Sequence, residues 1–172
     1  MSAIKIILII FGVVVVAVAG AGTAAIYGQA PKCPNQGGAA RSEKAIGDIL
    51  ENSGMVTVID SEATTIARKY IGGKVTDGRV CFTTGLGHAS GNIKLGPVNP
   101  SFYASAGVDL SGANPETTNL IITVGALPNM PFVSDQVGKI VAGLINDNLA
   151  KIELDKKYLA EFSQGSVTVT TP

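Results

Sequence analysis

Charged residues and the side chains that most often carry out chemistry are scarce in this sequence. Charged residues make up 15% of the 172 positions, and the 13 basic and 13 acidic residues balance. Without a basic excess, a nucleic-acid partner is not expected. One histidine, His88, and two cysteines, Cys33 and Cys81, are too few for a metal site. The glycines around His88 do not open a helix and so do not match a dinucleotide-binding loop. We therefore expect no metal and no cofactor.

Long apolar runs, in contrast, are present. From Ile6 to Ile26 the chain has 21 residues without a charge, enough for a helix to cross about 30 Å of hydrocarbon. We therefore predict a transmembrane anchor over residues 1–27, with Lys5 on the inner side. The alternative is a signal peptide that is cleaved after Ala17-Val18-Ala19 and leaves a secreted protein. Both interpretations place the rest of the chain outside the cytoplasm.

The two cysteines allow two interpretations. Outside the cytoplasm, Cys33 and Cys81 could form one disulfide. Alternatively, Cys81 is buried in a strand and Cys33 is exposed in a linker. The residues alone leave both open.

The remaining chain divides into a linker and one folded domain. Residues 28–54 begin with a stretch rich in Gly, Pro and Ala, which predicts a flexible tether to about residue 42. A short helix over 42–51, capped by Ser42, is expected at the end of this linker. The folded domain is predicted over 55–172. It starts with a strand over 55–60, followed by a helix that Asp60 or Ser61 caps and that ends near Gly72.

Six further strands follow from alternating apolar patterns and turn residues. We predict them over 78–84, 92–96, 101–110, 119–125, 157–163 and 166–171. Residues 85–91 read as a turn-rich connector, and Gln164-Gly165 as a tight hairpin. The short connectors favour antiparallel pairing. The predicted fold is α+β: a curved, mostly antiparallel sheet with one face in water and the other packed around one long helix.

The long helix, predicted over about 133–150, is unusually apolar. At about 100° per residue its apolar positions cover roughly half the circumference, more than a surface helix needs. These positions are Val133, Val137, Ile140, Val141, Leu144, Ile145 and Leu149. Such a helix faces a core, a membrane or an apolar ligand.

An apolar ligand site is therefore predicted between this helix and the sheet. Its candidate helix residues are Val137, Ile140, Val141, Leu144 and Ile145. Its candidate strand residues are Phe102, Ala104, Ala106, Val108, Ile122 and Val124. Small residues such as Ala104 and Ala106 would leave room for a ligand.

Catalytic residues are not evident. A hydrolase that uses His88 and Ser90 would need the two side chains to meet, but Ser90 precedes Gly91 directly and forms no Gly-x-Ser-x-Gly motif. The more economical interpretation is a structural histidine in a turn. The acids are scattered, with Asp60 at a helix start and Asp77-Gly78 at a turn, so no acid/base pair is indicated.

The order of several motifs resembles that of a known family. These motifs are "VTVIDSEATTIARKYI", "VTDGRVCFTTGLGHASGNIKLG", "LIITVGALPNMPFVSDQVGKIVAGLIN" and a closing "GSVTVT". Together, over roughly residues 55–171, they resemble small bacterial membrane-anchored proteins of the YpmS and LmeA types, which are similar to the tubular lipid-binding (TULIP-like) superfamily. The resemblance implies a long helix wrapped by a curved antiparallel sheet, with an apolar groove that can hold acyl chains. It implies no catalytic residue.

We therefore expect a non-enzymatic, membrane-anchored extracytoplasmic domain that binds lipid or another apolar ligand. The alternative is a closed, dry core in a scaffold or interaction module, with envelope proteins as partners at the solvent face or edge strands of the sheet.

Overall fold

The computed structural model describes residues 30–35, 37–70, 75–93, 99, 101–124, 150, 154 and 156–172. In chain order the elements are α2 (Glu43–Ser53), β1 (Met55–Ile59), α3 (Asp60–Tyr70), β2 (Val75–Thr83), β3 (Leu86–Ile93), β4 (Ser101–Asp109), β5 (Glu116–Val124), β6 (Leu159–Ser163) and β7 (Ser166–Thr170). The predicted α+β class is confirmed.

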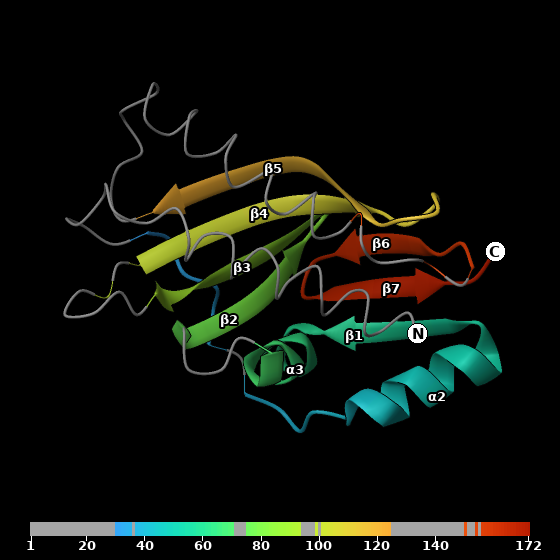
Figure 1. The fold of residues 1–172 in the computed structure, drawn as a ribbon. Coiled ribbons are helices and arrows are strands. Elements are labelled where there is room, and N and C mark those ends of the chain that lie inside the picture. The colour runs from blue at the N-terminus through green and yellow to red at the C-terminus, as the bar shows by residue number, and fades with distance from the viewer. Residues whose placement is uncertain are drawn as a thin grey trace.

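Every strand pair is antiparallel, as predicted, but the strands form two sheets instead of the single curved sheet expected. One sheet has four strands in the order β2-β3-β4-β5, and the other has three in the order β1-β7-β6. Figure 1 shows the three-stranded sheet beside one end of the four-stranded sheet. Because β1 pairs with β7, the beginning and the end of the folded domain lie together.

The two sheets meet at the tips of two hairpins. The backbone N–H of Gly165, in the β6–β7 turn, donates to the carbonyl of Phe82 at 3.0 Å. In return, the N–H of Gly85, in the β2–β3 turn, donates to the carbonyl of Phe162 at 3.1 Å. The rings of Phe82 and Phe162 lie 5.9 Å apart between centroids. Both turn glycines have φ near +80°, a conformation that other residues rarely adopt.

α2 begins where the sequence predicts, after Ser42, and ends two residues later than predicted, at Ser53 instead of Glu51. The Ser42 side chain accepts a hydrogen bond from the N–H of Ala45 at 3.2 Å and caps the helix. Gly54, with φ of 71°, ends it, and its N–H donates to the carbonyl of Leu50. The predicted short helix is therefore present and extends to Ser53.

The start of α3 differs from the prediction. Glu62 reaches back to accept from the N–H of Ile59 at 3.2 Å, as the glutamate of a capping box does. Asp60 instead accepts from the N–H of Phe82 at 2.9 Å. Asp60 does not cap the helix because its carboxylate faces β2.

Side chains of α3 complete the hydrogen bonding along the outer edge of β2. Three of them, four residues apart on the helix, bond to alternate residues of the strand over 2.9–3.0 Å. They are Asp60 to the N–H of Phe82, Thr64 to both the N–H and the carbonyl of Val80, and Arg68 to the carbonyl of Gly78. Four helix residues rise about 6 Å and two strand residues about 6.7 Å. This match lets α3 bond to β2 as a further strand would.

One predicted connector is a strand. Residues 86–91 belong to β3, and the turn before it is confined to Thr84 and Gly85. Gly91, within this strand, has no room for a side chain. A Cβ atom on Gly91 would lie 2.8 Å from Val75 Cγ1 and 3.1 Å from Phe102 Cε1. The glycine that suggests a turn in the sequence is therefore required here by its neighbours in the sheet.

Two irregularities interrupt the four-stranded sheet. The register shifts between Thr76 and Arg79 in β2 and between Ser105 and Gly107 in β4. Near these shifts Asp77 and Asn119 adopt φ of 53° and 52°. The predicted turn at Asp77-Gly78 is thus a bulge within β2, where a short polar side chain tolerates the left-handed conformation.

The four-stranded sheet has an apolar face and a polar face, defined by the register of its strands. The apolar face carries Val80, Phe82, Gly87, Ala89, Gly91, Phe102, Ala104 and Ala106. The polar face carries Arg79, Cys81, Thr83, His88, Ser90, Ser101, Tyr103 and Ser105. A solvent-exposed second face is predicted, but Cys81, His88, Ser90 and Ser105 are buried. Part of the chain predicted as a tether contacts this face at Cys81, Ser90 and Ser101.

The predicted transmembrane helix over residues 1–27 and the predicted long helix over 133–150 lie outside the described residues, except for Ala150. In the described part of the chain, neither helix has the length and apolarity needed to cross a membrane.

Candidate functional site

The strand half of the predicted ligand site lies on the apolar face. Buried there are Phe102, Ala104 and Ala106, and half-buried are Val108 and Ile122. Phe102 and Ala104 are no more than 1% exposed. α3 packs against β2, whereas this part of the face belongs to β3, β4 and β5. The apolar face therefore extends beyond β2, the strand against which α3 packs.

Small residues form much of this face. Across β3 and β4, Gly87 pairs with Ala106, and Ala89 pairs with Ala104. No side chain in these two pairs is larger than a methyl group. At the next pair the Phe102 ring lies over Gly91. Side chains therefore protrude little from the sheet at the first two residue pairs, and the Phe102 ring protrudes further at the third.

The helix half of the predicted site has no described counterpart. Val124 pairs with Phe102 at the end of β5, but its side chain lies outside the described residues. So do the predicted helix residues Val137, Ile140, Val141, Leu144 and Ile145. The structure brings together the strand residues of the prediction only.

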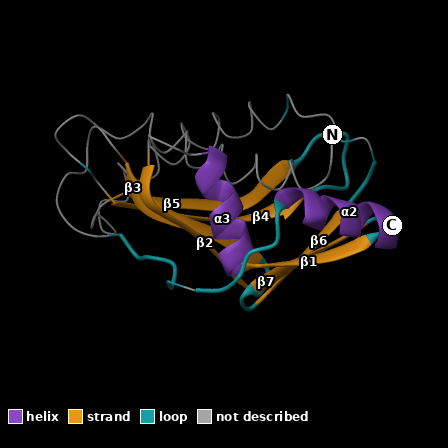
Figure 2. Ribbon diagram, turned by 90° about the horizontal axis from the view of Figure 1, so that it is seen from below, coloured by secondary structure: helices purple, strands orange, loops and turns teal. Residues whose placement is uncertain are grey.

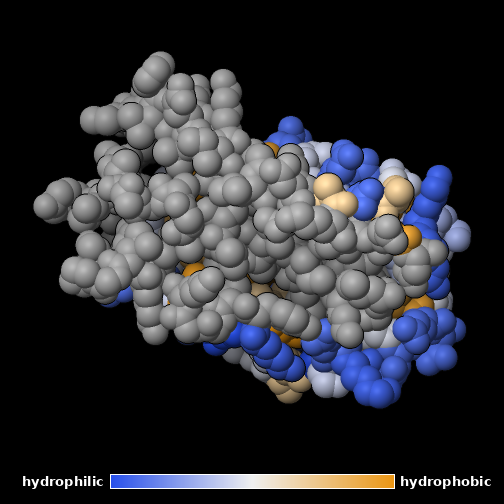
Figure 3. All heavy atoms as spheres, viewed as in Figure 1, coloured by the Kyte–Doolittle hydropathy of each residue, from blue (hydrophilic) through white to orange (hydrophobic). Residues whose placement is uncertain are grey.

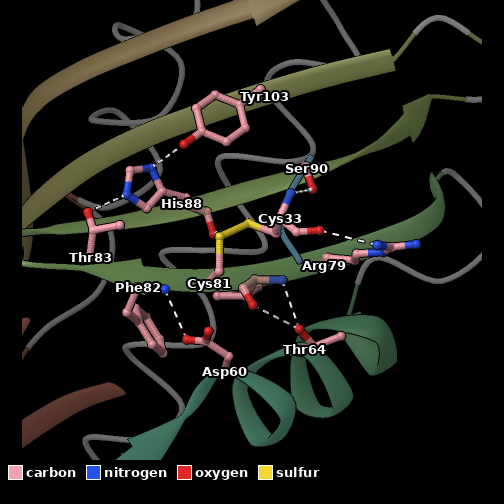
Figure 4. Close-up of a disulfide and its surroundings, with 11 residues drawn as sticks. Cys33, Asp60, Thr64, Arg79, Cys81, Phe82, Thr83, His88, Ser90 and Tyr103 are labelled. Carbon is pink, nitrogen blue, oxygen red and sulfur yellow. Dashed lines mark hydrogen bonds between the residues drawn. A yellow bond between two sulfur atoms is a disulfide. The ribbon is translucent and has the colours of Figure 1, made fainter. Parts of the chain in front are cut away.

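The opposite, polar face carries a disulfide between Cys33 and Cys81 (Figure 4). Of the two interpretations of the cysteines, the structure agrees with the disulfide. Cys33 is 1% exposed and Cys81 is 8% exposed. The linker cysteine is thus buried against β2 instead of lying in a free tether.

Backbone groups of the same segment are also bound to the polar face. The N–H of Cys33 donates to Ser90 Oγ of β3 at 2.9 Å, and the N–H of Ala30 donates to Ser101 Oγ of β4 at 2.7 Å. Arg79 of β2 donates to the carbonyl of Cys33 at 3.2 Å. Residues 30–33 are therefore attached to three neighbouring strands. The proline, glycine and alanine content of this segment predicts a flexible tether. That prediction is wrong for residues 30–33, because composition gives no information about a covalent bond to a distant strand.

His88 lies next to the disulfide on the polar face. Its Nε2 shares a hydrogen bond of 2.7 Å with Thr83 Oγ1, and its Nδ1 shares one of 2.8 Å with the Tyr103 hydroxyl (Figure 4). The His88 and Tyr103 rings are stacked with centroids 5.5 Å apart. Burial lowers the pKa of His88 and raises the pKa of Tyr103. Both shifts favour neutral side chains.

This arrangement does not form the His88–Ser90 pair that a hydrolase would need. Both ring nitrogens of His88 are engaged by Thr83 and Tyr103. Ser90 Oγ accepts from the backbone of Cys33. The sequence suggests that His88 lies in a turn, but the structure has it within β3.

An ion pair between the exposed Arg41 and the buried Glu62 joins the linker to the folded domain. Arg41 Nε and Nη2 donate to the two carboxylate oxygens of Glu62 at 2.5 and 2.7 Å. Hydrogen bonding to Arg41 lowers the pKa of Glu62. Arg41 also donates to the carbonyl of Thr57, while Glu62 accepts from Ile59, so the pair satisfies the edge of β1. The capping-box spacing of Glu62 could have indicated its role, but no pattern in the sequence indicates Arg41.

A few apolar side chains remain exposed on the three-stranded sheet. Met55 and Leu159 both pair with Thr170 and are 54% and 56% exposed, and Ile59 on the same face is 43% exposed. Thr57 and Thr168 form a hydroxyl hydrogen bond between them. Figure 3 shows that apolar residues on the described surface appear singly or in small groups among hydrophilic ones.

The described ranges contain no group of three or more His, Cys, Asp or Glu side chains placed to hold a metal ion. Their buried side-chain nitrogen and oxygen atoms all have hydrogen-bond partners. No known protein family, curated protein or solved structure matches this chain.

Proposed function

We propose that this chain is a membrane-anchored, non-enzymatic domain outside the cytoplasm that binds lipid or another apolar ligand on the apolar face of its four-stranded sheet. The observation that carries this proposal is the low, small-residue surface that β3 and β4 form beyond β2. In the proposal, the apolar helix predicted over 133–150 lies across this surface, and an acyl chain occupies the space between them. The resemblance to TULIP-like proteins suggests the same arrangement.

The chemistry of the two faces supports an apolar ligand. The polar side chains of β2, β3 and β4 lie on the opposite face, so Ala89, Ala104 and Ala106 offer a ligand no hydrogen-bonding side chain. Burying a methylene group contributes about 0.8 kcal/mol. An extended acyl chain could therefore bind without polar contacts along its length.

The disulfide supports a compartment outside the cytoplasm. Disulfides persist in oxidising environments and are rare in the cytosol. Cys33 and Cys81 are buried, which is typical of a structural bond rather than a redox-active one. This agrees with the anchor or signal peptide predicted over 1–27.

The side chains around His88 support a role other than catalysis. His88, Thr83 and Tyr103 bond to one another, and Ser90 bonds to the backbone of Cys33. In this arrangement the four groups hold the polar face together.

Native mass spectrometry of the full-length protein, extracted in mild detergent, tests the proposal. We expect a co-purified phospholipid or fatty acid. Ala104→Leu places three more carbons on the proposed floor and should reduce the bound fraction several-fold. Ala39→Leu, the same change at an exposed loop position, should leave it unchanged. Because added bulk in a packed site can destabilise the fold by about 1–3 kcal/mol, thermal unfolding of both variants is measured in parallel. A wild-type protein that carries and takes up no lipid contradicts the proposal.

The exposed Met55 and Leu159 favour a second candidate, an interaction module with a closed core. An experimental structure of the full chain separates the two. A void of roughly 300 Å3 or more between the apolar face and residues 133–150 supports ligand binding. A filled interface there supports the interaction module.

A further inference from the structure

Residues 30–33 are bound to the sheet, so they move with the folded domain and not with a flexible linker. These residues are held by the bond from Cys33 to Cys81 on β2, by Ser90 on β3 and by Ser101 on β4. Ala30 is 4% exposed. Within the described part of the chain, attachment to the sheet therefore begins at Ala30, well before the start of α2.

Very little chain separates this point from the predicted anchor. The apolar run ends at Ile26, so three residues lie between it and Ala30. A fully extended chain advances about 3.6 Å per residue, so Ala30 can lie no more than roughly 14 Å from the end of the run. Without the disulfide, the first strong attachment would be Arg41 to Glu62, and the same estimate gives roughly 54 Å.

We infer that the disulfide holds one end of the four-stranded sheet, where β4 begins at Ser101, against the lipid headgroups of the membrane. This inference rests on the anchoring part of the proposed function. The partner is the bilayer surface, and the short covalent connection provides the proximity. Charge contributes little, since Lys32 and Arg79 lie beside Asp77.

The opposite end of the domain is then turned away from the bilayer. In Figures 1 and 2, α2 and the C-terminus lie at the far end of the molecule from the first part of the described chain. The exposed Met55 and Leu159 belong to the three-stranded sheet at that end. An apolar ligand on β3 and β4 would consequently bind close to the membrane from which it is taken.

Full-length protein in vesicles of phosphatidylcholine and phosphatidylglycerol, with a quencher attached to the headgroups, tests this arrangement. A fluorophore is placed at Asn99, two residues from Ser101, or at Glu51 in α2, both of which are exposed. We expect quenching at Asn99 to exceed that at Glu51 several-fold.

Two insertions of the same length provide the matched control. About ten Gly/Ser residues add roughly 17 Å of average reach. Inserted between Gly28 and Gln29, before the disulfide, they should abolish the excess quenching at Asn99. Inserted between Gln36 and Gly37, after the disulfide, they should leave it unchanged. A Cβ atom on Gly37 would meet no other atom within 4 Å, so there is room for this insertion. In Cys33→Ser/Cys81→Ser, quenching at Asn99 should fall even without an insertion.

The outcomes separate this inference from the proposed function. Protein that does not float with the vesicles contradicts the anchor and with it the membrane part of the proposed function. Protein that floats but shows equal quenching at the two positions, or responds equally to the two insertions, contradicts only the inference. Lipid retention in native mass spectrometry is measured independently of both.

Discussion

At the scale of single residues, the polar face is organised around His88. Its two ring nitrogens bond to the Thr83 and Tyr103 hydroxyls, and burial lowers its pKa. A neutral imidazole can donate from one nitrogen and accept at the other, which suits two hydroxyl partners. A protonated ring would have to donate to both. Since both hydroxyls can also accept, it is burial that favours the neutral form in the folded state.

This arrangement predicts a loss of stability in mild acid. Because the pKa of His88 is lowered by folding, the unfolded chain binds its proton first as the pH falls below about 6.5. The free energy of unfolding should thus decrease from pH 7 to pH 5. Urea titrations followed by circular dichroism measure it, with His88→Gln as the comparison, since glutamine does not titrate. We expect a shallower pH dependence in the variant, and equal slopes in the two proteins would contradict the assignment.

Glu62 forms hydrogen bonds to residues outside its own helix. It caps α3, holds Arg41 of the linker and accepts from the edge of β1. In the sequence it is one acid among 13, and only its position near a helix start distinguishes it. Its partner Arg41 lies 21 residues away, and no local pattern connects the two.

At the scale of elements, α3 protects the edge strand β2. Exposed strand edges invite pairing with other chains. Thr64 covers both backbone groups of Val80, and Asp60 and Arg68 extend this contact to either side. The helix thus serves the sheet through polar side chains as well as through its apolar residues.

Thr64→Val tests this role. Valine has the shape of threonine but lacks the hydroxyl, so the N–H and carbonyl of Val80 lose their partner. We expect the free energy of unfolding to fall by about 1–3 kcal/mol and the amide of Val80 to exchange its hydrogen faster. Thr65→Val is the matched control, because the adjacent Thr65 is exposed and its hydroxyl bonds only to the carbonyl of Ser61 within α3. Equal effects of the two changes would argue against edge protection.

Elements with a strong local pattern could be predicted from the sequence. The alternation of β4, the Ser42 cap of α2 and the Gln164-Gly165 hairpin all agree with the structure. Of β3, only Asn92 and Ile93 fall within a predicted strand, because Gly87 and Gly91 suggest a turn when the sequence is considered alone. The packing of 30–33 depends on Cys81 and Ser101, far along the chain. The strand part of the candidate site was thus accessible from alternation, and the covering of the polar face was not.

At the scale of the whole molecule, the disulfide joins the linker to the centre of the fold. It closes a loop between residues 48 apart in the sequence. Within this loop lie α2, β1 and α3. The bond therefore constrains the first third of the described domain in the unfolded chain.

Removing the bond should cost substantial stability. For a loop of this length, the chain-entropy estimate is about 4 kcal/mol. We expect the free energy of unfolding of full-length Cys33→Ser/Cys81→Ser to be lower than that of the wild type by about 2–4 kcal/mol in urea titrations. Arg41 and Glu62 remain in the variant and keep the linker near α3. A change below about 1 kcal/mol would show that residues 30–33 are held mainly by their other contacts.

The pairing of β1 with β7 has a consequence for how the protein is made. Met55 lies opposite Thr170 and Ile59 opposite Ser166, so the first strand of the domain has no partner until the last has been synthesised. Val56 and Val58, which are buried in the finished sheet, therefore lie in a strand without a β-sheet partner while the chain is incomplete. The segment from Cys33 to Cys81 can be closed by its disulfide long before then. The order of events during biogenesis would thus be cross-linking first and sheet completion last.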